Sequence, residues 1–400
     1  VFNTLVSHPD QFEQKLAMAF RHALGPTPGP AHLSVPLDVM RAPASQYVPA
    51  CLHRLLPEYA SSITPALLEK LQHEMTAPRR LTLLIGEGAA KAMQAIIRLA
   101  EHFQWLLVVT PRGKGLVPES HALYRGVYGF AGHQSAATAV SAAGTDLVLI
   151  VGTELNEVTT GGWTKSGLLG NRLVHLSENP SHLQRSPYAA MSLQCSIEPL
   201  FSALCESWLG HSWRRLSEGG SRSILPNLPG VVLDEPKKCG DFSSPIKPQA
   251  LFRYLGDQWT AETRVYADSG CSYLWGIHYA CFHGPLRNGR SPFQIGIGFS
   301  SMGWAIGAAV GAAFGSEGQP VVCITGDGSF LMSGQEITTA LHDNLNVLFI
   351  ILNDASLGMV KHGQRLAGAE AIGTRLPAVD FALMAHAMGV KSHRITSFQQ

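Results

Sequence analysis

Two apolar runs near the end of the chain, each followed at once by an acidic residue, constrain the fold more than any other feature. Val321 to Thr325 leads into Gly326-Asp327-Gly328, and Asn346 to Leu352 leads into Asn353-Asp354. Continuous apolar runs of this length are typical of parallel strands that are buried on both faces. One predicted helix, residues 333–341, separates them, so a right-handed crossover lays the two strands side by side. The pattern predicts an open α/β sheet with both acidic motifs at neighbouring strand ends.

The chemistry of these strand ends indicates a bound phosphate and a metal. Open α/β sheets bind ligands at the carboxyl ends of their strands. The glycines around Asp327 let the backbone approach a ligand, and Ser329 opens a helix whose N-terminus favours an anion. The carboxylates of Asp327 and Asp354 suit a Mg²⁺ ion that keeps positions open for phosphate oxygens. These residues indicate Mg²⁺ with a di- or triphosphate, although Gly, Asp and Asn are also the usual residues of ordinary turns.

Strand and helix patterns alternate through most of the chain. Strands are predicted at 81–85, 105–110, 147–151, 173–176 and 264–267, and helices at 90–102, 136–143, 251–259 and 304–314. This alternation implies doubly wound parallel sheets with crossover helices. A Ser/Gly/Pro-rich linker over residues 216–247 divides the chain into one α/β unit at 60–215 and a second at 248–400.

The first 45 residues form a smaller unit. A helical pattern over residues 9–24 precedes a strand pattern at 32–36, with little core of its own. A Pro/Ala-rich linker follows at 41–49. Residues 1–45 therefore look like the C-terminal tail of a domain whose body precedes the chain. The absence of an initial methionine and a new helical pattern at the chain end also indicate a fragment.

Composition limits the partners of this chain. Its 30 basic and 29 acidic side chains give no electrostatic reason to expect nucleic acid or an anionic membrane surface. No apolar stretch is long enough to span a bilayer, and no basic-then-apolar leader is present. The seven cysteines form no C-x-x-C pair, and their odd number does not suit a disulfide framework. We expect a small-molecule ligand and a reducing, cytoplasmic setting.

The stretch from Gly326 to Met359 resembles a known motif. In the thiamine-diphosphate-dependent superfamily of acetolactate synthases, pyruvate oxidases and 2-oxoacid decarboxylases, Gly-Asp-Gly is followed at a set interval by Asn-Asn. Asp354 follows Asp327 by 27 residues, which matches that interval. The resemblance is to the large, catalytic subunit of acetolactate synthases in particular.

Regions before this motif resemble the same superfamily. The middle domain of acetolactate synthases is matched by Arg112 to Gly115, Pro118-Glu119, Gly126, Gly129 and His133. Gly29 to Val39 resembles the end of the pyrimidine-binding domain. The similarity covers nearly all of the chain. It implies a thiamine-diphosphate-binding fold with a Rossmann-like middle domain at 60–215, a diphosphate-binding domain at 248–400, and the tail of a pyrimidine-binding domain at 1–45.

The resemblance assigns roles to individual residues. It implies that Asp327 and Asp354 bind Mg²⁺ through their side chains and that the carbonyl of Ser356 is a third ligand. Met302 matches the apolar residue that supports the bent cofactor, with simple core packing as the alternative. The carbonyl of Ser300 would accept from the aminopyrimidine. The implied cofactor contacts are Gly270, Cys271, Ser300, Met302, Gly326, Gly328, Ser329 and Met359. The catalytic residue is unknown, because the activating glutamate is expected outside this sequence.

The implied activity is decarboxylation of a 2-oxoacid such as pyruvate with carboligation to an acceptor, dependent on thiamine diphosphate and Mg²⁺. Such an enzyme is a transferase or lyase and works as a homodimer or homotetramer. Two alternatives stay open: a simple decarboxylase or oxidase of the same superfamily, and a non-catalytic relative that keeps the cofactor.

Several residues depart from the family pattern. Asp354 stands where a second asparagine is usual and adds a negative charge beside the diphosphate. Gly363 replaces a tryptophan that shapes the second-substrate pocket in anabolic acetolactate synthases. Lys361 and His362 either line the mouth of the site or are solvated. The preference for an acceptor is therefore open.

The middle domain leaves FAD binding open. His133 matches a flavin contact of acetolactate synthases and pyruvate oxidases, but Glu157 stands where an arginine is usual. Gly86-Glu87-Gly88 lacks the third glycine of a dinucleotide loop, which disfavours a nicotinamide enzyme. The aromatic loop Tyr273 to His283 either borders the substrate or packs in the core or at a subunit interface.

Overall fold

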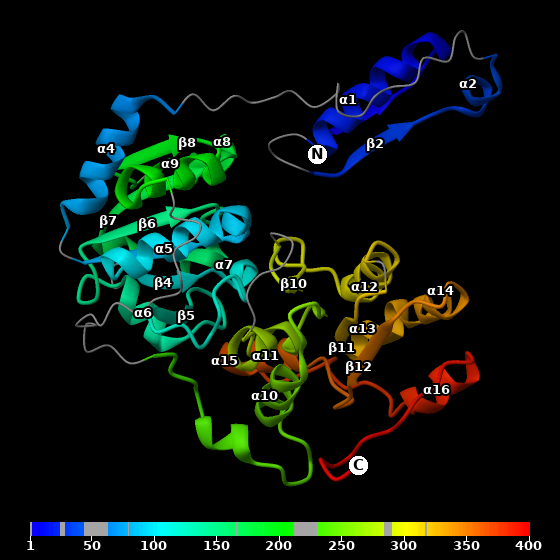
Figure 1. Cartoon of the computed structure of the whole chain (residues 1–400). Helices are drawn as coiled ribbons and strands as arrows, with labels where there is room; N and C mark the ends of the chain where they lie inside the picture. The colour runs from blue at the N-terminus through cyan, green and yellow to red at the C-terminus, as the bar shows by residue number, and fades with distance from the viewer. Residues whose placement is uncertain are drawn as a thin grey trace.

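The computed structural model describes residues 2–24, 29–43, 63–78, 80–164, 167–186, 188–211, 230–283, 290–316 and 318–400. Figure 1 shows a short N-terminal segment in blue, a cyan-to-green α/β unit and a yellow-to-red α/β unit. Each contains one sheet, and every strand pair in the three sheets is parallel. The predicted doubly wound parallel fold is confirmed.

The N-terminal segment pairs two short strands. β1 (Phe2–Leu5) lies parallel to β2 (Ala31–Ser34), and α1 (Phe12–Leu24) connects them. The helix predicted at 9–24 and the strand predicted at 32–36 are confirmed, although residues 9–11 form a 3₁₀ turn and the strand ends two residues earlier, at Ser34. β1 was not predicted, because four residues of alternating exposure carry too weak a pattern. A short helix, α2 (Leu37–Arg41), follows, and most of the predicted linker 41–49 lies outside the described residues.

The middle unit has a six-stranded sheet in the order β5-β4-β3-β6-β7-β8. Its strands are β3 (Leu81–Ile85), β4 (Leu106–Val109), β5 (Tyr124–Val127), β6 (Leu147–Val151), β7 (Arg172–Ser177) and β8 (Met191–Gln194). Its helices are α4 (Pro65–Thr76), α5 (Met93–Phe103), α6 (Gln134–Val140), α7 (Glu157–Thr160), α8 (Pro180–Leu183) and α9 (Ile197–Leu209). The two edge strands β5 and β8 were not predicted, because they are short and carry polar residues or glycine.

Alternate side chains of the middle strands pack into different cores. Leu83 and Ile85 of β3 pack with α5 and α9 on one face of the sheet. Leu84 packs with α6 on the other face. Covering both faces requires strands that are apolar throughout, which is why β3, β4 and β6 could be found from sequence.

The third unit has a four-stranded sheet in the order β10-β9-β11-β12. Its strands are β9 (Arg264–Ala267), β10 (Phe293–Ile295), β11 (Val321–Gly326) and β12 (Val347–Leu352). Its helices are α10 (Pro248–Gln258), α11 (Cys271–Tyr279), α12 (Trp304–Phe314), α13 (Asp327–Ser333), α14 (Ile337–His342), α15 (Gly358–Leu366) and α16 (Phe381–Ala387). α11 packs on one face of the sheet with α10, and α12 and α16 pack on the other.

The predicted helix 333–341 is wrong at its start. Helix begins at Asp327 as α13, passes through a 3₁₀ turn at Gly334–Glu336, and resumes as α14. The ring of Phe330 lies so close to Gly334 that a Cβ there would be 2.6 Å from a ring carbon. Phe330 is fully buried, and its ring fills the space beside Gly334 at the break between the two helices.

The second half of the predicted linker 216–247 bonds to both α/β units. Residues 212–229 lie outside the described part, but 230–247 do not. The amide of Val232 donates to Ser135 Oγ at 3.0 Å, and the amide of Asp234 donates to His278 Nε2 at 2.9 Å. The domain limits themselves stay a prediction.

Candidate cofactor and metal site

The two acidic motifs lie at neighbouring strand ends, as the sequence predicts. β11 and β12 pair in parallel register with Gly326 opposite Leu352, so Asp327 and Asn353-Asp354 follow at the same edge of the sheet. β9 pairs with the other side of β11, and Gly270-Cys271 follow its end at the N-terminus of α11. The pairing of β9, β11 and β12 therefore brings together the segments that follow them, which begin at Gly270, Asp327 and Asn353.

The Asp327 carboxylate is buried and held by backbone amides. Its Oδ1 accepts from the Gly328 amide at 2.7 Å, and its Oδ2 accepts from the Ser356 amide at 3.3 Å. Burial raises the pKa of Asp327, these amides oppose the rise, and the nearby negative charge of Asp354 adds to it. A bound cation would relieve both the burial and the repulsion.

Cys271 and Asp354 approach the same point, the first residue of α15. A Cβ placed on Gly358 would lie 3.1 Å from Cys271 Sγ and 3.7 Å from Asp354 Oδ2. Burial raises the pKa of the Cys271 thiol, and the charge of Asp354 raises it further. The thiol therefore stays protonated beside Asp354 and does not compete for a hard cation.

Met302 contacts the glycine of the strand-end motif. A Cβ on Gly328 would lie 2.7 Å from Leu357 Cδ2, 3.2 Å from Met302 Cε and 3.3 Å from Leu376 Cδ1. Met302 is thus part of the site edge and does not merely fill a distant core. The sequence did not predict that Leu357 and Leu376 lie at the site, because an isolated leucine in a loop carries no motif information.

Two loops at this edge contain residues with unusual backbone conformations. Ser300 and Ala355 have positive φ angles of 54° and 52°, although neither is glycine. Gly270, Gly298 and Gly303 also have positive φ. Non-glycine residues in this region are strained, and such strain concentrates at functional sites. The loops that carry Ser300 and Ser356 fit this rule.

Ser356 has a polar atom without a partner. Its Oγ is buried and makes no hydrogen bond in the structure, while its carbonyl accepts from the Gly358 amide at 2.8 Å. A carbonyl has a second lone pair, so it can still bind a cation. Within the described residues, no three His, Cys, Asp or Glu side chains are placed to hold a metal together. The predicted set of two carboxylates and one carbonyl therefore needs phosphate or water oxygens to complete it, which suits Mg²⁺.

The residues of α15 differ in exposure. Met359 is partly buried against the apolar core, whereas His362 and Gly363 are exposed. A Cβ on Gly363 would meet nothing within 4 Å. The structure therefore leaves open space beside Gly363, the position at which the family pattern predicts a tryptophan.

The prediction of an aromatic loop at 273–283 is wrong for most of its length, because residues 273–279 belong to helix α11. His278 is buried, and its Nδ1 lies 3.2 Å from the carbonyl oxygen of Ala131 in the middle unit. Tyr279 is also buried and donates to the carbonyl of Asp234 at 2.8 Å. These contacts favour the core-packing alternative for the segment 273–283.

His133 is likewise used inside the protein. Its Nδ1 accepts from the Val127 amide at 2.9 Å, so its Nε2 carries the proton and donates to the His278 carbonyl at 2.9 Å. Burial lowers the pKa of His133 to about 3, and the positive charge of Lys114 contributes. Neither ring nitrogen is left for a ligand.

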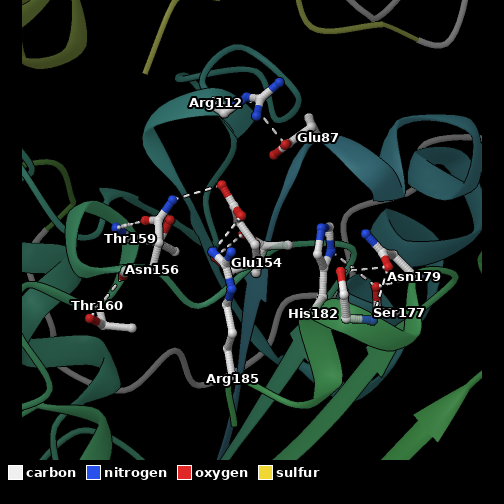
Figure 2. A network of polar contacts seen from close by, with 12 residues as sticks. Glu87, Arg112, Glu154, Asn156, Thr159, Thr160, Ser177, Asn179, His182 and Arg185 are labelled. Carbon is white, nitrogen blue, oxygen red and sulfur yellow. Dashed lines mark hydrogen bonds and ion pairs between the residues drawn. The ribbon is translucent and has the colours of Figure 1, made fainter. Parts of the chain in front are cut away.

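The carboxyl edge of the middle sheet carries paired charges, as Figure 2 shows. Glu87 follows β3 and pairs with Arg112 Nε at 3.2 Å. Glu154 follows β6, accepts from Asn156 Nδ2 at 2.7 Å and pairs with Arg185 at 2.8 Å. Gly86 and Gly88 lie against Gly152 and Thr153, so close packing of strand ends explains both glycines. Glu157 begins α7, and Asn156 caps that helix.

Comparison with protein families matches both α/β units. Residues 68–204 match the thiamine pyrophosphate enzyme central domain, and residues 268–400 match the C-terminal TPP binding domain of the same enzymes. The two matches cover more than half of the chain and include every predicted cofactor contact. The chain belongs to the thiamine pyrophosphate enzyme family.

Within this family the chain is similar to acetolactate synthase large subunits. It is 25% identical to the isozyme 2 large subunit of Escherichia coli over 99% of this chain and 69% of that protein. It is 25% identical to the isozyme 1 large subunit over 91% and 62%. It is 26% identical to the large subunit of Corynebacterium glutamicum over 91% and 57%. The chain thus spans 57 to 69% of the length of these relatives.

A solved structure confirms the fold. The thiamine diphosphate-dependent 4-hydroxybenzoylformate decarboxylase of Rhodococcus jostii aligns with a TM-score of 0.75 over 98% of this chain and 70% of that chain. The identity is 21%, so this likeness concerns the fold alone. No helix in the described part of the chain combines the length and apolar character needed to cross a membrane.

Proposed function

We propose that this chain belongs to an enzyme that decarboxylates a 2-oxoacid such as pyruvate and joins the remaining fragment to an acceptor, as acetolactate synthases do. The observation that carries this proposal is the pair Asp327 and Asp354 at the ends of two adjacent parallel strands. The similarity to acetolactate synthase large subunits supports the choice of reaction.

The residues fit thiamine diphosphate with Mg²⁺. Asp327, Asp354 and the carbonyl of Ser356 would hold the metal, and Ser356 Oγ is a buried polar atom in need of a partner. A Cβ placed on Gly270 would meet no atom within 4 Å, so the backbone of Gly270 borders open space. Gly270 follows β9, which pairs with β11 on the side away from β12 and Asp354. The cofactor supplies the nucleophile and the electron sink that decarboxylation requires. The chain's own residues position it, with Met302 fixed against Gly328.

A flavin is not part of this proposal. The diphosphate of FAD is an anion, but the arginines at the strand ends of the middle sheet are already paired with carboxylates, Arg112 with Glu87 and Arg185 with Glu154. Burial raises the pKa of Glu87, the positive charge of Arg112 opposes this rise, and the charge of Glu154 adds to it. His133, the residue that matches a flavin contact, has both ring nitrogens engaged. We expect purified protein to lack flavin absorbance.

The enzyme is proposed to act as a homodimer or homotetramer in the cytoplasm. Its activating glutamate would come from a pyrimidine-binding domain that packs against the strand ends of the third unit. The exposed residues at this edge support such an arrangement. The side chain of Phe299, beside the predicted contact Ser300, is 96% exposed, which is unusual for a phenylalanine.

The deciding experiment uses the full-length protein with Mg²⁺ and thiamine diphosphate. Calorimetry should show cofactor binding that depends on the metal, and pyruvate should release CO₂ and form acetolactate. Release of CO₂ with aldehyde as the only product would instead support a simple decarboxylase. Cofactor binding without turnover of any 2-oxoacid would support a non-catalytic relative, and absence of cofactor binding would overturn the proposal.

A further inference from the structure

A buried carboxylate, Asp268, lies beside the candidate site but is none of the predicted cofactor contacts. It directly follows β9, and its exposed fraction is 0%. Its amide donates to the carbonyl of Ile324 at 2.8 Å and continues the pairing between β9 and β11 by one residue. A carboxylate in such a place is costly unless several donors satisfy it.

Donors from three different segments converge on the Asp268 carboxylate. Thr325 Oγ1 donates to Oδ2 at 2.8 Å, from the residue before Gly326-Asp327. The Ser269 amide donates to Oδ1 at 2.8 Å, from the residue before Gly270-Cys271. The Gly303 amide lies 3.1 Å from both oxygens and belongs to the residue after Met302.

The same carboxylate caps α12. Gly303 is the residue before this helix, and the amide of Ala305 in its first turn also bonds to Asp268. A negative charge at the N-terminus of an 11-residue helix is stabilised by the helix dipole. Burial raises the pKa of Asp268, but the hydroxyl and the amides oppose that rise, so these donors favour the ionised form.

The loop 298–303 has an unusual backbone conformation that other parts of the protein must fix. Gly298, Ser300 and Gly303 all have positive φ, and Ser300 is not glycine. A strained loop keeps one conformation only where its surroundings fix it. Its amino end is held by the Ser300 amide, which donates to the Gly296 carbonyl at 3.0 Å. Its carboxyl end is held by Asp268 through Gly303.

We propose that Asp268 is a positioning residue that fixes the loop 298–303 against the Gly326-Asp327-Gly328 strand end. It thereby sets the distance between Met302 and Gly328 and the direction of the Ser300 carbonyl. Thr325 is its partner in this role, because its hydroxyl joins the carboxylate to the strand that carries Asp327. The inference rests on the proposed cofactor, and its test includes a measurement that does not require the cofactor.

Thr325→Val separates a positioning role from a purely structural one. It removes the hydroxyl and keeps the shape, and Thr325→Ser should restore the hydrogen bond. Thr82→Val is a matched control, since Thr82 is also a fully buried strand residue, with its hydroxyl bonded to the carbonyl of Ala139 at 2.9 Å in the middle unit. Asp268→Asn is the stronger change, because it removes the charge and turns one acceptor into a donor.

Two quantities are measured on full-length protein: the dissociation constant of thiamine diphosphate with Mg²⁺ by calorimetry, and amide hydrogen exchange of residues 298–303 without cofactor. Thr325→Val should weaken binding about 5-fold and Asp268→Asn at least 10-fold, and both should speed exchange of the loop. Thr82→Val and Thr325→Ser should match the wild type in both quantities.

The outcomes separate the two proposals. If the wild type binds no cofactor, the proposed function fails, and the exchange rates still test the positioning role. If Thr325→Val folds and shows wild-type affinity and wild-type exchange of the loop, the positioning role is wrong. Equal losses of affinity in Thr325→Val and Thr82→Val would also overturn it, because a general loss of stability would then explain both.

Discussion

The Asp327 carboxylate accepts a hydrogen bond from the amide of Ser356 at 3.3 Å, so the two loops proposed to hold the metal are joined without it. The bond crosses from the end of β11 to the loop after β12. It orients one carboxylate oxygen toward the residue whose carbonyl is the third proposed ligand. A metal that binds here meets a site that is already largely formed, which lowers the cost of binding.

Replacement of Asp327 tests the metal assignment. Asp327→Ala should abolish Mg²⁺-dependent retention of thiamine diphosphate and weaken cofactor affinity on the order of 100-fold, because a charged ligand is lost. Calorimetric titration of the cofactor at saturating Mg²⁺ measures this change. Asp343→Ala is the control, because Asp343 lies after α14 and contacts no predicted site residue. Unchanged retention in Asp327→Ala would refute the assignment.

Any side chain at position 328 should reduce the affinity for the cofactor. Gly328→Ala places a methyl group 2.7 Å from Leu357 Cδ2 and 3.2 Å from Met302 Cε, so both side chains must move. We expect stability close to that of the wild type, since these are flexible side-chain ends, and a dissociation constant raised about 10-fold.

Gly363→Ala is the matched control for that change. Gly363 lies within α15, and a Cβ there meets nothing within 4 Å. Alanine in a helix interior is more favourable than glycine, so thermal unfolding should show a gain of about 0.5–1 kcal/mol. Cofactor affinity should not change. Equal affinities of the two variants would contradict the close packing of Met302 on Gly328.

The strain at Ala355 should be removable. Its φ of 52° disfavours alanine, whereas glycine adopts this conformation freely. Ala355→Gly should therefore raise the free energy of unfolding by about 1 kcal/mol, as measured by chemical denaturation. Ala312→Gly is the control, because Ala312 lies within α12 and the same change there should lower stability by about 1 kcal/mol. A loss of stability in Ala355→Gly would contradict the strained conformation.

The buried His133 should make the protein sensitive to acid. Burial lowers the pKa of His133 from 6.5 to about 3, so the folded state binds fewer protons than the unfolded state between these values. Stability conferred by the neutral ring is complete above pH 6.5 and is lost as the pH falls toward 3. Since one pKa unit corresponds to about 1.4 kcal/mol, the full loss is on the order of 5 kcal/mol.

Denaturant unfolding between pH 7.5 and pH 4 measures this dependence. His133→Gln should lower stability at neutral pH and flatten the slope below pH 6.5. His342→Gln should keep the wild-type slope, because His342 is an exposed residue at the end of α14. The same slope in wild type and His133→Gln would show that other groups govern the acid response.

Much of the third unit was predictable because its strands are buried on both faces. The observed limits of β9 match the predicted limits. Those of β11 and β12 each differ from the predicted limits by one residue at one end. β10 has three residues and was missed, because a run that short carries no period. The break between α13 and α14 was missed as well, because a three-residue 3₁₀ turn is too short to interrupt a helical pattern in the sequence.

The sequence by itself determined the family, the parallel α/β fold and the meeting of Asp327 with Asp354 at one sheet edge. Strand period, strand order and motif spacing are local or nearly local properties, so they can be read along the chain. Only the tertiary structure decided that Met302, Leu357 and Leu376 lie against Gly328, that both ring nitrogens of His133 are hydrogen-bonded, and that Asp268 joins three segments of the chain. These relationships join residues that are distant in sequence, and their energies depend on burial and on hydrogen-bond geometry that no single segment encodes.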